Sequence, residues 1–149
     1  GMYTSLPKSF DYIEWFGRGP YENYEDRKES TFVGLFSGKV KDQHFEHVMP
    51  QENGNKSDVR WLKISNENEC SLFISMYSVF NFNIQNYSDQ ALNTSKTSHI
   101  LHRGDKTYLH IDYKQMGLGG DDSWSPRVHD EFLLNNKTYH YCISLRMDE

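Results

Sequence analysis

Hydrophobic and polar residues alternate with a period of two in several short stretches of the chain. This period places alternate side chains on opposite faces of a β-strand, and it is the main structural signal in the sequence. The alternation predicts six strands, at residues 10–16, 31–36, 58–64, 72–77, 108–113 and 139–145. Glycine, asparagine and aspartate residues between them are typical of the turns that join antiparallel strands.

Details of the pattern predict the faces of one strand and two local features. Strict alternation in residues 58–64 places Leu62 and Ile64 on one face and Val59 on the other. A turn at residues 135–136 is expected to join residues 132–134 to the last strand as a hairpin. One helical turn is expected at residues 89–92, where the Ser88 hydroxyl can cap free backbone N–H groups.

Length and composition favour one domain of the all-β class. The chain has 149 residues, 15% of them aromatic, and a single alanine, Ala91, so a helical bundle is unfavourable. The interpretation is a sandwich of antiparallel strands over residues 10–149, with residues 1–9 as a lead-in. Gly1 before Met2 is typical of a residue left by tag removal, so the N-terminus assigns no compartment, and bacterial cytoplasm and periplasm both stay open.

Charge and cysteine content exclude some function classes. The formal net charge is −5 and no run of lysine or arginine exceeds two, which argues against nucleic acid or an anionic membrane surface as partners. The most apolar stretch, residues 72–76, is too short to cross a bilayer. Cys70 and Cys142 lie beside apolar strands and are expected to be buried free thiols, with a disulfide as the alternative.

Three loop segments, residues 15–27, 49–56 and 116–126, contain more glycine, proline, asparagine and aromatic residues than turns require. In the third, glycines permit unusual backbone conformations, and Trp124 follows in a polar context. A flat indole can stack on the C–H face of a sugar while nearby polar groups bind its hydroxyls. Trp124 is therefore either a ligand platform or a residue that pins its loop to the core.

Other polar residues in these segments have structural alternatives. Glu52 and Asn53 either contact a ligand or fix their own loop by hydrogen bonds. Asp121 and Asp122 either bind a cation or, as is usual after paired glycines, form a turn. In the first segment Arg18, Asp26 and Arg27 are expected to form an ion-pair network. His44 and His47 lack the helical context for a zinc site.

The three segments resemble one known family. The motifs WFGRGPYENYxDR at 15–27, PQENG at 50–54 and GxGGDDSWSP at 117–126, where x is any residue, occur in the same order and at similar spacing in the C-terminal, small-chain region of the β-galactosidases of glycoside hydrolase family 2. The segment that begins at Tyr87 and the sequence LHID at 109–112 are similar to that family too. The resemblance extends over about residues 10–146.

The resemblance implies an antiparallel β-supersandwich, the galactose mutarotase-like fold. The family domain has more strands than this chain can supply, so the chain is expected to be its C-terminal part. An apolar face or sheet edge would then be exposed, which favours self-association or assembly into a homo-oligomer.

The resemblance also implies a division of labour within a retaining β-galactosidase that hydrolyses terminal β-D-galactosides of the lactose type. Its two catalytic glutamates belong to another domain, so this chain alone is expected to be inactive, with no catalytic and no metal-binding residue. Trp124 matches the family tryptophan that forms an apolar wall of the galactose pocket. The family's Mg²⁺ and Na⁺ sites lie outside this region, and the implied partners are a galactoside and the remaining enzyme domains.

Two other functions stay open. A stand-alone carbohydrate-binding module would bind galactose without other domains. A mutarotase-like aldose epimerase, suggested by fold analogy, would need a general acid and base, for which His99, His110 and Glu131 are candidates.

Overall fold

The computed structural model describes residues 1–136 and 138–148, and these form one antiparallel sheet of seven strands. The strands are β1 (Met2–Pro7), β2 (Tyr12–Gly19), β3 (Phe32–Lys39), β4 (Lys56–Ser65), β5 (Ser71–Gln85), β6 (Lys106–Asp112) and β7 (Ile143–Asp148). The helix α1 (Asp89–Thr94) and the 3₁₀ turns η1 (Val40–Asp42), η2 (Ser98–Ile100) and η3 (Asp130–Phe132) complete the fold. The all-β fold class is confirmed.

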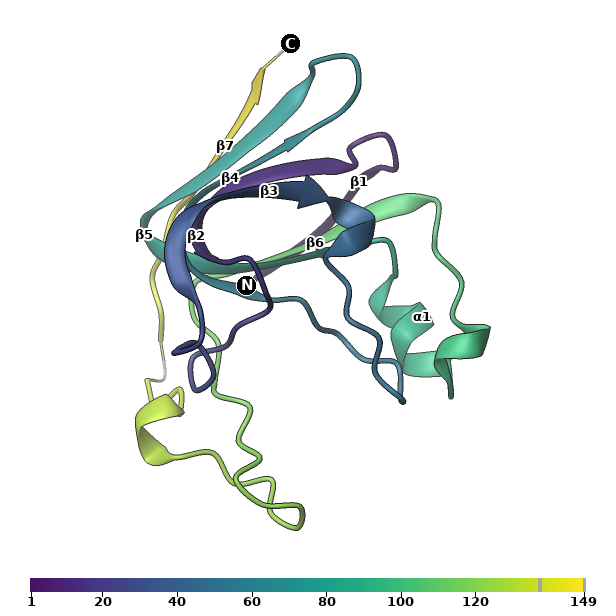
Figure 1. Cartoon of the computed structure of the whole chain (residues 1–149). Coiled ribbons are helices and arrows are strands. Elements are labelled where there is room, and N and C mark those ends of the chain that lie inside the picture. Colours follow the sequence, from purple (N-terminus) through teal and green to yellow (C-terminus); the bar gives the residue numbers. More distant parts are fainter. Residues whose placement is uncertain (137, 149) are drawn as a thin grey trace.

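The strand order is β1-β6-β5-β4-β2-β3, and β7 also pairs with β5. The long strand β5 serves two parts of the sheet, because residues 71–76 pair with β7 and residues 81–85 pair with β6. Beside it, β4 has register shifts between Lys56 and Trp61, and such irregularities bend a strand. Figure 1 shows the result, a sheet that curls so that β2, β3 and β4 lie opposite β6.

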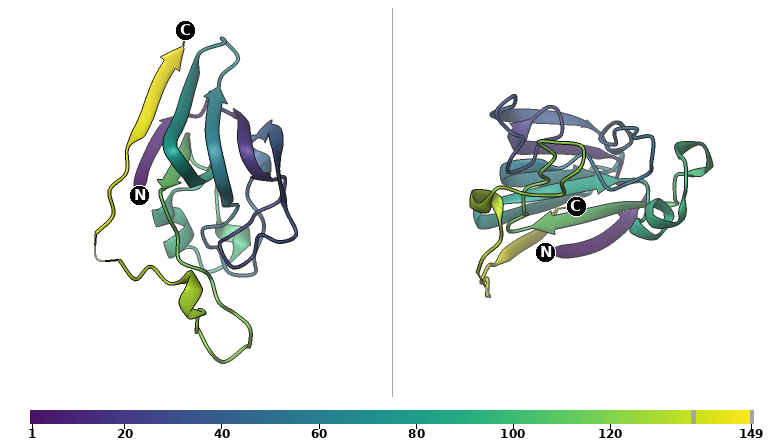
Figure 2. Two further views of the ribbon diagram at one scale, coloured as in Figure 1. Left: turned by 90° about the vertical axis from the view of Figure 1, so that its left-hand side faces the viewer. Right: turned by 90° about the horizontal axis from the view of Figure 1, so that it is seen from below.

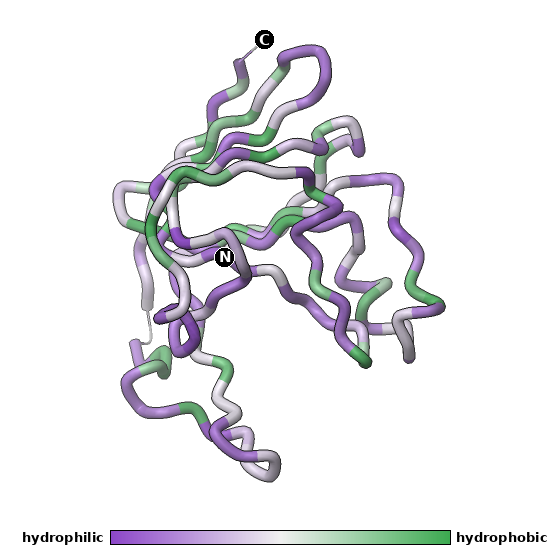
Figure 3. The backbone as a smooth tube through the Cα atoms, viewed as in Figure 1, coloured by the Kyte–Doolittle hydropathy of each residue, from purple (hydrophilic) through white to green (hydrophobic). Residues whose placement is uncertain are grey.

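The concave side of this curl holds the hydrophobic core. Trp15, Phe80 and Phe82 are its largest hydrophobic side chains, and the Trp15 and Phe82 rings meet edge to face at 5.9 Å. Along the second half of β5 the apolar residues point into the core and alternate with buried amides. Figure 3 shows apolar residues concentrated in the curled strands and polar residues along most of the connecting loops.

The β4 irregularity corrects one prediction. Strict alternation places Val59 opposite Leu62 and Ile64, yet all three are fully buried in the same core. Val59 lies opposite Phe80, whereas Trp61 lies opposite Ser75, so the regular pairing of β4 with β5 is interrupted between these two positions. This interruption breaks the strict alternation and allows Val59 to face the same core as Leu62.

Three other local predictions have mixed outcomes. The helix at α1 is confirmed, with the Ser88 hydroxyl accepting the Ala91 N–H at 3.1 Å. The hairpin around residues 135–136 is wrong: residue 137 lies outside the described residues, but Phe132 ends η3, and the last strand begins at Ile143 and pairs with β5. Long-range pairing thus outweighs the local turn signal. Both thiols are free, but neither is buried, and Cys142 is exposed.

The sheet leaves apolar groups uncovered at its margins. Residues 2–7, in the segment expected to be a lead-in, form the edge strand β1 against β6. At β7, Leu145 and Met147 lie opposite the core residues Ile74 and Leu72, yet they are 52% and 54% exposed. Figure 2 shows β7 beside β5 at the margin of the sheet.

In the described ranges, no helix is long and apolar enough to cross a membrane.

Candidate functional site

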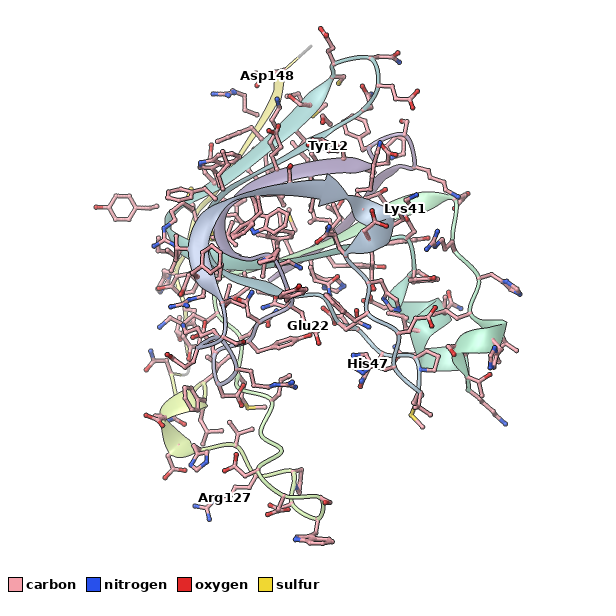
Figure 4. The ribbon with its side chains drawn as sticks, in the orientation of Figure 1. Tyr12, Glu22, Lys41, His47, Arg127 and Asp148 are labelled. Atoms are coloured by element: carbon pink, nitrogen blue, oxygen red, sulfur yellow. The ribbon has the colours of Figure 1, made fainter. Side chains whose placement is uncertain are left out.

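The Gly-rich loop, defined as residues 117–126, extends away from the sheet between β6 and η3. Figure 1 shows this segment projecting from one end of the molecule, and Figure 4 places Arg127, the residue after it, far from the curled strands. Trp124 in this loop is 87% exposed. The interpretation in which Trp124 pins the loop to the core is therefore wrong for this chain.

The backbone around Trp124 is held by a turn. The Asp122 carboxylate accepts hydrogen bonds from the Trp124 N–H at 2.9 Å and the Ser125 N–H at 2.6 Å. Gly119 and Gly120 precede it with φ of +71° and +93°, a region that favours glycine. The turn interpretation of Asp122 is thus confirmed. Asp121 instead pairs with His129, Oδ2 to Nε2, at 2.5 Å.

The base of the Gly-rich loop is attached to the connection between β2 and β3. The Asp26 Oδ2 atom accepts the Gly119 N–H at 2.7 Å, across 93 positions of sequence. The same oxygen lies so close to Gly117 that a Cβ there would be 2.6 Å from it. On the other side, the Gly117 N–H donates to the Phe132 carbonyl at 3.0 Å.

The β2–β3 connection is attached in turn to the second loop segment. Glu22 accepts the Gly54 N–H at 2.9 Å and the Tyr24 hydroxyl at 3.1 Å. Burial, followed by the charge of Glu22, raises the pKa of Tyr24, so this hydroxyl stays protonated. The three loop segments singled out in the sequence therefore meet, with residues 22–26 bonded to both of the others.

The predicted ion-pair network has different members. Arg18 pairs with Asp58, Nε to Oδ2, at 2.5 Å, and also donates to the Thr31 carbonyl at 2.8 Å. Burial alone would raise the pKa of the Asp58 carboxyl, but the Arg18 hydrogen bond and the Lys28 charge outweigh burial and lower it. Asp26 lies outside this pairing because it binds the Gly-rich loop.

Glu52 and Asn53 are the two candidate residues of the second loop segment, and Asn53 fixes the conformation of that segment. Its side chain is buried and exchanges two hydrogen bonds with the Phe45 backbone, at 2.8 and 2.7 Å, so the loop-fixing interpretation is confirmed for this residue. Glu52 lies near His110, with 4.0 Å between Oε1 and Nδ1. Burial raises the pKa of the Glu52 carboxyl, and the nearby carboxylates of Asp89 and Asp112 add to this effect.

The three epimerase candidates belong to three different elements, and the structure records no contact that brings them together among the described residues. His110 on β6 bonds to Asp89 of α1 at 3.0 Å, and His99 belongs to η2. Glu131 in η3 lines two cavities, of about 300 and 650 Å³, and neither histidine is in their linings. Sequence reasoning missed the smaller cavity, which Tyr113 and Phe132 line beside the inner end of the Gly-rich loop.

Taken together, the fold and these loops define a class: an all-β domain that presents an exposed aromatic residue on a loop attached to its sheet. A model of the β-galactosidase small-chain family matches residues 1–145. The chain belongs to this family, which confirms the resemblance found in the sequence.

Curated relatives support the same assignment. The chain is 41% identical over 147 residues to a β-galactosidase of Vibrio cholerae, 37% over 147 residues to one of Priestia megaterium and 36% over 146 residues to one of Pseudoalteromonas haloplanktis. These alignments cover 99%, 98% and 97% of this chain, but only 14%, 14% and 13% of the relatives' length. The chain thus corresponds to a small part of each relative.

Proposed function

We propose that this chain is the non-catalytic C-terminal domain of a β-galactosidase of glycoside hydrolase family 2, and that Trp124 forms one wall of the galactose-binding pocket. The observation that carries the proposal is the 87% exposure of Trp124 on a loop with a defined turn. Covering a large apolar ring that is exposed to water lowers the free energy. The C–H face of a galactosyl ring, together with the facing surface of another domain, offers such cover.

In this proposal the chain contributes binding and exclusion of water rather than proton transfer. A retaining glycosidase places two carboxyl groups about 5–5.5 Å apart, one as acid/base and one as nucleophile. Both would come from the remaining enzyme domains, since the relatives extend far beyond the matched region. Trp124 would hold the sugar ring in position beside them and keep water from the reacting bond.

The test is Trp124→Ala in the assembled β-galactosidase that contains this sequence. We expect KM for lactose to rise on the order of tenfold with a small change in kcat, because the lost contact acts on substrate binding. Tyr77→Ala is the matched control, because it removes a fully exposed aromatic side chain from the sheet. Unchanged KM and kcat in Trp124→Ala would overturn the proposal.

A titration of this chain alone with galactose separates the proposal from a stand-alone binding module. We expect no heat of binding, because one tryptophan and a few polar groups provide only part of a pocket. A millimolar Kd, about −4 kcal/mol, that disappears in Trp124→Ala would favour the binding module instead.

A further inference from the structure

We propose that Asp26 is a positioning residue for substrate binding, which acts by holding the Gly-rich loop and therefore acts only through Trp124. This inference rests on the proposed function of Trp124. The sequence places Asp26 in the connection between β2 and β3, 98 positions before the tryptophan, so their link is visible only in the folded chain.

The Asp26 carboxylate touches the loop at two glycines. Its Oδ2 atom accepts the Gly119 N–H at 2.7 Å and packs against Gly117, where a Cβ would not fit. Its Oδ1 atom is buried and has no hydrogen-bond partner among the described residues. A buried carboxylate oxygen without a partner is unfavourable, because it has lost its hydrogen bonds to water. The Asp26 carboxylate therefore contacts the Gly-rich loop at a cost in solvation free energy.

Asp26 is itself held in place by the structure on its other side. It lies in a tight turn in which the Arg27 N–H donates to the Tyr24 carbonyl at 2.9 Å. Next to this turn, Glu22 binds the Gly54 N–H of the second loop segment. A continuous set of contacts therefore leads from the sheet through Asp26 to the Gly-rich loop.

The remaining side-chain hydrogen bonds of the loop are local. Asp122 binds the Trp124 and Ser125 amides, and Asp121 pairs with His129. Within the described part of the chain, Asp26 is the residue outside positions 117–132 whose side chain hydrogen-bonds this loop. Local bonds fix the shape of the loop tip, whereas the Asp26 bond fixes where that tip lies relative to the sheet. A loop without this bond must be ordered by the substrate, which weakens binding.

The experiment is a double-mutant cycle with Asp26→Ala and Trp124→Ala in the assembled β-galactosidase. We expect Asp26→Ala to raise KM about two- to tenfold with little change in kcat, and to have no further effect once Trp124 is alanine. Glu29→Ala removes an exposed carboxylate from the same connection and should leave KM unchanged. Hydrogen exchange in the same enzymes should be faster at residues 117–126 in Asp26→Ala and unchanged in the strands.

Two conservative variants distinguish positioning from general destabilisation. Asp26→Asn keeps an oxygen for the Gly119 amide and should retain most of the wild-type KM. Asp26→Glu keeps the charge but displaces the carboxylate, which already packs against Gly117. We therefore expect a KM near that of Asp26→Ala. If Asp26→Ala does not fold, Asp26→Glu replaces it in the double-mutant cycle.

The failures of the two proposals are distinguishable. An unchanged KM in Trp124→Ala overturns the proposed function and this inference with it. A raised KM in Trp124→Ala, together with an unchanged KM in the Asp26 variants or an effect that adds to that of Trp124→Ala, overturns the role of Asp26 alone.

Discussion

The ammonium group of Lys56 lies 5.6 Å from the centroid of the Trp15 ring, inside the core, and forms no salt bridge with a carboxylate of the described residues. Its Nζ atom donates to the Gly54 carbonyl at 2.9 Å, and the Phe45 ring lies 5.9 Å away on another side. Burial lowers the pKa of Lys56 to about 8, although the charge of Glu22 partly opposes the shift. The lysine thus links the second loop segment to the core at the cost of removing a charge from water.

This burial predicts that folding stability changes with pH above neutrality. Between about pH 8 and pH 10.5 the folded protein has released the Lys56 proton while the unfolded chain still binds it, so the free energy of unfolding rises with pH in this window. The gain is at most about 3 kcal/mol. Lys56→Met removes the effect, and the difference in unfolding free energy between wild type and variant should therefore rise from pH 7 to pH 10.

Urea unfolding at a series of pH values measures this difference. The comparison is necessary because burial raises the pKa of Tyr24, and this has the opposite effect on stability above about pH 10. Lys63→Met, on the outer face of the same strand, is the control for loss of a lysine. A difference between wild type and Lys56→Met that stays constant with pH would contradict the prediction.

The period-two pattern was sufficient to predict the fold class, because alternation reports directly which face of a strand is buried. It did not predict the β4 irregularity, since a bulge depends on how two strands fit together and not on the strand itself. The second half of β5 was also missed, although Phe80, Phe82 and Ile84 alternate with polar residues there. Asparagine is common in turns, so the amide residues in this segment indicated a turn rather than a strand. In the structure both faces of this strand are buried, and the amides lie on one of them.

The part of the site that could be predicted from the sequence is the part that the composition of the loops reveals. Glycines followed by a tryptophan in a polar segment indicated Trp124, whose role in binding stays a prediction. The attachment of that loop was not predictable, because Asp26 and Gly119 are 93 positions apart in sequence and meet only in the folded chain. Charged residues that are close in sequence suggest an ion pair. In the structure, however, Arg18 pairs with Asp58 of β4, which is distant in sequence.

Substitution of Gly117 tests the closeness of this attachment. A Cβ at position 117 would lie 2.6 Å from the Asp26 carboxylate and 2.8 Å from the Phe132 Cβ, so Gly117→Ala must move one of them. We expect a rise in KM of the assembled enzyme in the same direction as for Trp124→Ala, and smaller. Leu118→Ala, at an exposed neighbouring position, should have no such effect. Equal KM values for the two alanine variants would show that the contact at Gly117 is not needed.

The Arg18–Asp58 pair predicts a contribution to stability that disappears in acid. Asp58 has a φ of +51°, which asparagine tolerates, so Asp58→Asn removes the charge with little change in backbone preference. We expect a loss of about 1–2 kcal/mol at pH 7. Because the folded-state pKa of Asp58 is lowered, the wild type should lose this advantage as the pH falls through that value.

The Lys39–Asp11 pair provides the control for this prediction. Its two side chains are more exposed, and Asp11→Asn should therefore have a much smaller effect at pH 7. Thermal unfolding of both variants at pH 7 and in acid makes the comparison. An Asp58→Asn variant as stable as Asp11→Asn at pH 7 would contradict the expected role of the pair.

Leu145 and Met147 predict that this chain associates with itself when studied alone. Both side chains lie on the core-facing side of β7, where the sheet has no opposite layer, and the outer edge of β7 has no neighbouring strand in the described structure. An edge with apolar side chains is a template for pairing with another chain. We expect the sedimentation coefficient to increase with protein concentration, and the double substitution of Leu145 and Met147 by lysine to reduce the increase. Ser144→Lys places one lysine on the other face of β7 and should leave the association in place. A wild-type chain that sediments as a monomer at all concentrations would refute the prediction.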